Sequence, residues 1–243
     1  MTIIDKQHAR LRHKKILKNL DLLYPRVRCA LHYDGAFQLL VATILSAQCT
    51  DTRVNLVTPA LFAKFGMAEK MAVATIAQIE TLIRSTGFYH SKAKYISGAA
   101  KMIVEKFQGK VPRTMEAILM LPGVARKTAN VVLSVGFGIR AGVVVDTHVS
   151  RLSGKLGLSD KKTPEKIEQD LMRIVAREKW NTFSLQLIQH GRLVCIARRP
   201  RCGECVLRTL CPSAGKFDKK IPQKRKAIRS SNALGVKLHA KKR

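Results

Sequence analysis

The sequence predicts an all-α fold. Apolar residues recur at helical spacing along most of the 243 residues, and glycine, proline and capping residues separate the predicted helices. The one strand-like run, 143–145, is too isolated to form a sheet. Hydrophobic residues make up 46% of the chain, which is enough for a folded core, and no apolar run approaches the length of a membrane span.

The first predicted helices follow one another closely. Residues 36–47 form a dense apolar run rich in leucine and alanine. Residues 71–83 carry apolar side chains at helical spacing, and Gly87 is a plausible stop. We expect Ser91 to cap a helix that runs to Phe107.

The C-terminal third continues the helical pattern and then changes in kind. Residues 163–165 predict the start of a helix: Thr163 can cap it, Pro164 suits its first position, and Glu165 places an acid in its first turn. Residues 180–194 form a further helical segment. Residues 215–243 hold eleven Lys or Arg against one acid and few large apolar side chains, so we predict a disordered basic tail.

The net charge of the chain indicates an anionic binding partner. There are 45 Lys plus Arg against 16 Asp plus Glu, a formal charge of +29, which favours a nucleic-acid partner. No basic amphipathic helix with an aromatic face indicates a membrane surface, and the 5% of aromatics argues against a stacking platform. Residues 1–18 lack the apolar core of a secretory signal, so we expect an intracellular protein with reduced cysteines.

Four cysteines near the C-terminus indicate a metal site. They follow the spacing C-x6-C-x2-C-x5-C and are Cys195, Cys202, Cys205 and Cys211. Thiolates select zinc, copper(I) or iron–sulfur clusters, and a single C-x2-C with longer arms can wrap a [4Fe–4S] cluster. Structural zinc remains the competing interpretation at this point, and disulfides are disfavoured by the reducing compartment. We expect Cys29 and Cys49 to be buried thiols.

The sequence LPGVARKTAN at 121–130 is the second motif. A short helix at 115–120, a tight turn at Pro122 and Gly123, and a second helix from Ala125 through Val135 would form a helix-hairpin-helix. The free N–H groups of the turn and of the second helix would then bind a phosphate. The alternative is a simple loop between core helices. The positive net charge of the chain favours the DNA-binding interpretation.

Together these motifs resemble the endonuclease III family of DNA-repair glycosylases. The sequence LPGVARKTANVVL is followed by VDTHV at 145–149 and then by the cysteine loop, with LSAQ at 45–48 and SKAK at 91–94 also matching. The resemblance covers residues 37–211 in the right order. It implies a two-lobe helix-hairpin-helix glycosylase fold with a [4Fe–4S] cluster as cofactor. The six-helix lobe would span 29–140, with the hairpin at about 115–135, and the cluster lobe would combine 1–28 with 141–214.

The resemblance assigns the catalytic roles to Lys127 and Asp146. The family excises a base through an amine that attacks the sugar C1′ and becomes a Schiff base. Burial, the neighbouring Arg126 and the helix N-terminus should favour the neutral amine of Lys127, although a lysine in a basic hairpin can also contact phosphate. Asp146 is expected both to cap a helix and to stabilise positive charge on the sugar. For His148 the sequence leaves two roles open: a polar group of the pocket or a packed side chain.

The resemblance also implies DNA contacts. Gln48 matches the residue that enters the space left by an extruded base, since a base must leave the stack to be excised. Phe88 stands where many relatives have a leucine wedge, with core packing as its alternative, and Ala125 stands where relatives often have glycine. The remaining expected contacts, at the hairpin and the cysteine loop, are Gly123, Arg126, Arg198, Arg199 and Arg201.

The expected function is therefore a bifunctional DNA glycosylase and AP lyase of base excision repair. It would act as a monomer on double-stranded DNA with damaged bases or abasic sites, remove oxidised pyrimidines and cleave the strand by β-elimination. A monofunctional adenine glycosylase is disfavoured, because those relatives lack the lysine and carry an acid in the segment matching 39–50, where this chain has none. A non-catalytic iron–sulfur or zinc DNA-binding protein is the other alternative.

Overall fold

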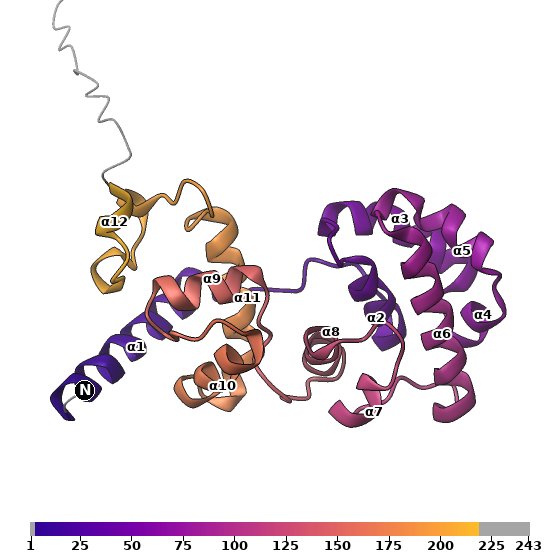
Figure 1. Ribbon diagram of the computed structural model, residues 1–243, viewed down its shortest axis with the longest axis horizontal. Coiled ribbons are helices and arrows are strands. Elements are labelled where there is room, and N and C mark those ends of the chain that lie inside the picture. Colours follow the sequence, from indigo (N-terminus) through magenta and orange to yellow (C-terminus); the bar gives the residue numbers. More distant parts are fainter. Residues whose placement is uncertain (1–2, 219–243) are drawn as a thin grey trace, which may run out of the picture.

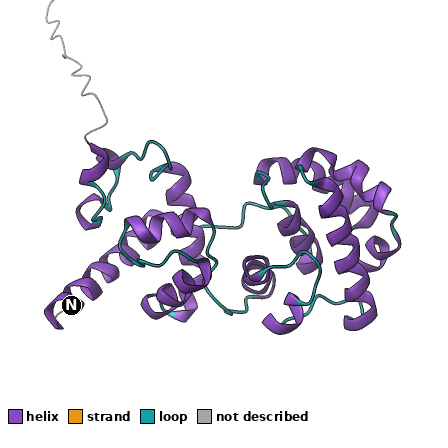
Figure 2. Ribbon diagram, in the orientation of Figure 1, coloured by secondary structure: helices purple, strands orange, loops and turns teal. Residues whose placement is uncertain are grey.

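The structure is a computed structural model that describes residues 3–218 (Figure 1). Within that range the chain consists of helices and loops, without a strand (Figure 2), so the all-α prediction is confirmed. Among these residues no helix is long and apolar enough to cross a membrane. The predicted basic tail lies outside the described residues from 219 onward, and its first four residues form the short helix α12 (Gly215–Asp218).

Buried apolar side chains form two separate cores, which correspond to two groups of helices in Figure 1. The first core is built by α2 (Gly35–Leu45), α3 (Asp51–Phe65), α4 (Ala68–Val73), α5 (Ile76–Ile83), α6 (Tyr89–Phe107), α7 (Met115–Leu119) and α8 (Arg126–Val131). The second is built by α1 (Ile3–Leu23), α9 (Thr147–Lys155), α10 (Pro164–Ile174) and α11 (Trp180–Leu193). The chain thus leaves one lobe after α1 and returns after α8. The lobe limits given above stay a prediction.

Several helix boundaries differ from the sequence-based expectation. Residues 71–83 are two helices, because the side chain of Thr75 accepts the N–H of Gln78 and begins α5 as a capping box. Helix α6 begins at Tyr89 with Phe88 at its N-cap position, so the expected cap at Ser91 is wrong. Thr163 does precede α10, but its side chain makes no capping hydrogen bond.

The helix-hairpin-helix forms as predicted. Helices α7 and α8 flank a turn in which Gly123 has φ of +76°, and α8 continues as a π-helical turn from Val132 to Gly136. A Cβ atom on Gly123 would lie 2.6 Å from Cβ of Tyr95 on α6. Glycine is therefore needed at this position both for the backbone conformation and for close packing of the hairpin on α6.

Candidate active site and cysteine loop

A cleft of about 480 Å³ lies between the two lobes. Its walls come from the linker after α1, the ends of α2 and α3, α8, the segment before α9, and α11. Lys127 and Asp146 both line this cleft, and both also line a second hollow next to it. The structure therefore brings the two expected catalytic residues together in a cavity of the size that binds small ligands.

Lys127 is the second residue of α8, so its side chain starts at the positive end of a helix. The expected burial is wrong, because Lys127 is exposed in the free protein. Its side chain lies at the wall of an open cleft, and only a bound partner could cover it.

Arg126 binds Glu168 of the second lobe. The Nε and Nη2 atoms of Arg126 donate to the two carboxylate oxygens of Glu168 at 2.7 and 3.2 Å, which raises the pKa of the arginine. Asn130 Nδ2 donates to the same carboxylate at 3.0 Å. Glu168 is only 4% exposed, so this network joins α8 to α10 through a buried charge.

Asp146 is the N-cap of α9. Its Oδ1 atom accepts the N–H of Val149 at 2.8 Å, which fixes the carboxylate at the end of the apolar run. His148, two residues after Asp146, is half-buried, and burial lowers its pKa against the opposing effect of Asp146. Nδ1 of His148 lies 3.2 Å from Nη2 of Arg151, which suits a neutral imidazole that accepts.

The two residues expected to enter DNA both occupy strained turns. Gln48 has φ of +51° in the turn between α2 and α3, and it is exposed. Phe88 has φ of +49° directly after Gly87 and is 66% exposed, so the core-packing alternative for Phe88 is wrong. Left-handed backbone is costly for glutamine and phenylalanine, and such strain is typical of functional positions.

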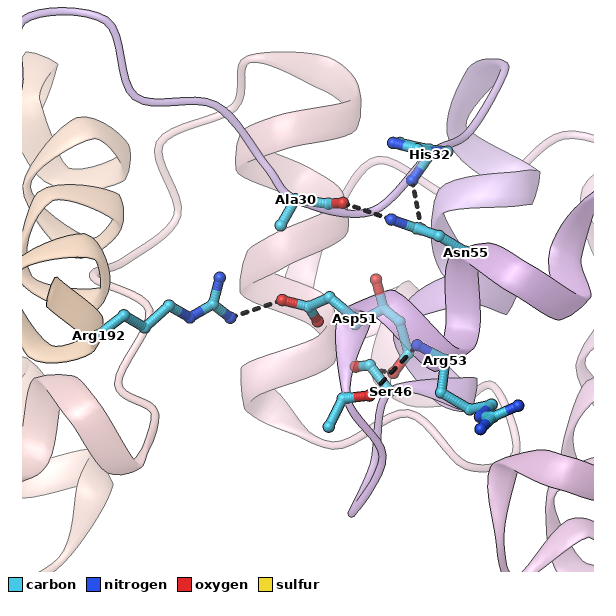
Figure 3. A network of polar contacts seen from close by, with 9 residues as sticks. Ala30, His32, Ser46, Asp51, Arg53, Asn55 and Arg192 are labelled. Atoms are coloured by element: carbon cyan, nitrogen blue, oxygen red, sulfur yellow. Dashed lines mark hydrogen bonds and ion pairs between the residues drawn. The ribbon is translucent and has the colours of Figure 1, made fainter.

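An ion pair that the sequence did not predict crosses the cleft. Nη2 of Arg192 on α11 donates to Oδ2 of Asp51, the first residue of α3, at 2.6 Å, and both residues line the cleft (Figure 3). In the same view, the side chain of Asn55 accepts from His32 N and donates to Ala30 O, which anchors the linker that forms part of the cleft wall. The two partners of the ion pair are 141 residues apart, so no local pattern could have identified it.

All four loop cysteines line one cavity at the end of the second lobe, and no described cysteine forms a disulfide. Among residues 3–218, no three His, Cys, Asp or Glu side chains are placed to hold a single metal ion.

The surroundings of the cavity suit an anionic cluster. Burial raises the pKa of the Cys195 and Cys205 thiols. A cysteine that binds metal must be deprotonated, so a bound metal centre would stabilise the thiolate forms. Lys155, Arg201 and Arg208 line the cavity, and none of the described Asp or Glu residues does. These residues fit a [4Fe–4S] cluster.

Further contacts connect the cavity with its surroundings. Nη1 of Arg151 lies 3.8 Å from Cys195 Sγ and also donates to the Cys195 carbonyl. Nε2 of His190 lies 3.5 Å from Cys205 Sγ, and burial lowers the pKa of His190 to about 4, so its imidazole is neutral. The predicted phosphate-binding side chains of the loop, Arg198, Arg199 and Arg201, are exposed.

Comparisons with known proteins agree with this architecture. Residues 41–177 match the HhH-GPD superfamily of base excision DNA repair proteins, and residues 195–211 match the iron–sulfur binding domain of endonuclease III. The chain is 58% identical to endonuclease III of Synechocystis over 203 residues, which is 84% of this chain and 93% of that protein. It is 37% identical to endonuclease III of Escherichia coli K12 over 204 residues, 84% of this chain and 96% of that protein.

Solved structures show the same likeness. A non-covalent endonuclease III–DNA complex superposes with a TM-score of 0.83 at 38% identity and covers 87% of this chain and 99% of its own. A trapped endonuclease III–DNA covalent intermediate, described as an estranged-adenine complex, gives 0.82 at 38% identity, covering 85% and 97%. A family match over more than half of the chain and relatives this similar over most of its length leave one assignment: the chain belongs to the endonuclease III family of helix-hairpin-helix base excision repair proteins.

Proposed function

We propose that this chain is a bifunctional DNA glycosylase and AP lyase that removes oxidised pyrimidines from double-stranded DNA. The observation that carries the proposal is the meeting of Lys127 and Asp146 in the cleft between the lobes. The cleft is open to solvent, so it can accept a base turned out of a duplex. The protein carries a large positive net charge, which attracts the DNA backbone. With DNA as its substrate, the protein would act inside the cell at the chromosome.

In the proposed reaction the neutral amine of Lys127 attacks C1′ of the damaged nucleotide. The bond from C1′ to the base breaks as the new N–C1′ bond forms, and the base leaves with a proton. The C1′–O4′ bond then opens as O4′ takes up a proton from solvent, which gives a protonated Schiff base between Lys127 and the sugar. Loss of a C2′ proton breaks the C3′–O bond and cuts the strand, and water finally releases the lysine.

Asp146 is suited to assist the first of these steps. Its Oδ1 atom is held by the N–H of Val149 at the start of α9, so the carboxylate is pre-positioned before substrate binds. Negative charge fixed near C1′ stabilises the positive charge that develops on the sugar as the base departs. A bound duplex would cover the exposed Lys127 and exclude water from it, which supplies the burial that the free protein lacks.

DNA recognition in this proposal is shared among three features. Gln48 and Phe88 are exposed and held in strained turns, which suits side chains that enter the duplex as the target base leaves it. The hairpin around Gly123 and Ala125, with the N–H groups of α8, would bind the backbone, while the guanidinium of Arg126 holds Glu168. The [4Fe–4S] cluster would order the loop that presents Arg198, Arg199 and Arg201 to phosphates.

The decisive experiment is borohydride trapping on a duplex with one abasic site, combined with excision from a duplex with one oxidised pyrimidine. We expect the wild-type protein to form a covalent adduct and to release the base, and Lys127→Ala to do neither while still binding DNA. Lys106→Ala, an exposed lysine at the end of α6, is the matched control and should behave as wild type.

The alternatives predict different products. A monofunctional adenine glycosylase would release adenine opposite oxidised guanine without forming an adduct. A non-catalytic DNA-binding protein would give no product on any of these duplexes. An adduct that persists in Lys127→Ala would show that another amine is the nucleophile.

A further inference from the structure

Lys92 is a buried charge that the reaction does not use. It lies in the first turns of α6, and only 3% of the residue is exposed. Its Nζ atom donates to the carbonyl oxygen of Leu45 at 2.8 Å and to that of Thr86 at 2.8 Å. Burial lowers its pKa, but a neutral amine still donates two hydrogen bonds, so both contacts survive in either protonation state.

The two carbonyls that Lys92 binds lie at corresponding places in the fold. Leu45 is the last residue of α2, and the turn that follows carries Gln48. Thr86 ends the short 3₁₀ helix Arg84–Thr86, and the next two residues are Gly87 and Phe88. One side chain therefore joins the starts of the two strained turns that carry Gln48 and Phe88.

The chemistry of this contact suits an ammonium group. The last carbonyls of a helix have no partner within the helix, and they carry the negative end of its dipole. Two such helix ends meet at Lys92 inside the first core. Lysine is rarely buried to this extent, and an apolar side chain would fill the position but leave both carbonyls without a donor.

We propose that Lys92 is a positioning residue that holds the Gln48 and Phe88 turns in a fixed relation, so that both side chains enter the duplex together. This inference rests on the proposed function, because it concerns the step in which the target base leaves the helix. Each turn has left-handed backbone that would relax if it were free, and the turns are about 40 residues apart in the sequence. A link outside both turns is what keeps them in register.

The test uses Lys92→Met, which keeps most of the length of the side chain and removes its donors. Lys101→Met, an exposed lysine on the same helix, is the control. The first readout is single-turnover excision of an oxidised pyrimidine from a duplex. The second is the fluorescence of 2-aminopurine placed opposite a stable abasic analogue, which rises when the opposite base is pushed out of the stack. The third is cleavage of a single-stranded abasic oligonucleotide, which requires Lys127 but no filling of a duplex.

We expect Lys92→Met to slow excision from the duplex by roughly ten- to a hundredfold, as misplaced contact groups do, and to reduce the fluorescence rise. Cleavage of the single strand should stay within about twofold of wild type, because the chemical step is untouched. The effect should also disappear in a background of Gln48→Ala with Phe88→Ala, since Lys92 would then have nothing left to position. Lys101→Met should match wild type in every assay.

Two outcomes would overturn the inference. One is an equal loss of duplex excision and single-strand cleavage in a folded variant, which would make Lys92 a general stability residue. The other is a loss of the same size in the double-alanine background. If Lys92→Met does not fold, Lys92→Gln, which keeps a donor group on a shorter side chain, is judged by the same comparisons. A wild-type protein that cleaves neither substrate would refute the proposed function instead.

Discussion

Replacing Arg126 with methionine should destabilise the fold more than its partly exposed position suggests. The substitution leaves the Glu168 carboxylate, 4% exposed, with the Asn130 amide as its remaining partner in this network. Removing one member of a buried ion pair costs about 3–5 kcal/mol. The side chain of Arg126 is 44% exposed and the Asn130 hydrogen bond remains, so we reduce the expected loss to about 2–3 kcal/mol.

The assay is reversible or scan-rate-controlled unfolding of the protein with its cluster intact, under anaerobic conditions. For a chain of this size a loss of about 2–3 kcal/mol corresponds to a fall of roughly 4–12 °C in Tm. Arg173→Met is the matched control, because Arg173 pairs with Asp170 at the surface at 3.4 Å and is 76% exposed. That variant should lose less than about 1 kcal/mol. Adding Glu168→Gln to Arg126→Met should recover part of the stability, since it removes the uncompensated charge.

The competing interpretation is that Arg126 serves mainly as a phosphate contact. In that case Arg126→Met would keep the Tm of the wild type, and the slope of log affinity against log salt concentration would flatten by about 0.9. A stability loss no greater than that of Arg173→Met, together with such a change in slope, would refute the structural role. Because α10 holds α8 through this network, the role also bears on how firmly Lys127 is placed at the cleft.

Three further predictions follow from the site. Asp146→Asn keeps a helix cap, so we expect a stability loss well under about 1 kcal/mol but a fall of orders of magnitude in base excision; turnover at the wild-type level would reduce Asp146 to a cap. Purified protein should contain about four irons per chain, which Cys202→Ser should lose and Cys29→Ser should retain; one zinc per chain without visible absorption would contradict the cluster. Deleting residues 219–243 should weaken binding to damaged and undamaged duplexes alike and flatten the salt slope, and a lower Tm with an unchanged slope would show instead that the tail belongs to the folded protein.

The parts of the fold that the sequence predicted well have local causes. The hairpin follows from Pro122 and Gly123, whose turn chemistry acts within a few residues, and the cysteine spacing indicated the cluster loop before any tertiary information. The break between α4 and α5 was missed, although Thr75 and Gln78 have the spacing of a capping box. The continuous apolar pattern of residues 71–83 concealed it, since periodicity alone cannot detect two helices that share a buried face.

The features that could not be predicted depend on residues far apart in the sequence. Arg192 on α11 and Asp51 on α3 belong to different lobes, and only the folded arrangement of the two lobes brings them together across the cleft. The burial of Lys92 could not be predicted either, because lysine is almost always exposed at the protein surface. Its burial follows from two helix ends that the fold brings together, and each end precedes a turn with left-handed backbone. Left-handed backbone at Gln48 and Phe88 and the buried Lys92, which donates to the carbonyl that precedes each turn, belong to one arrangement. In our proposal this arrangement holds both side chains in place before a duplex binds.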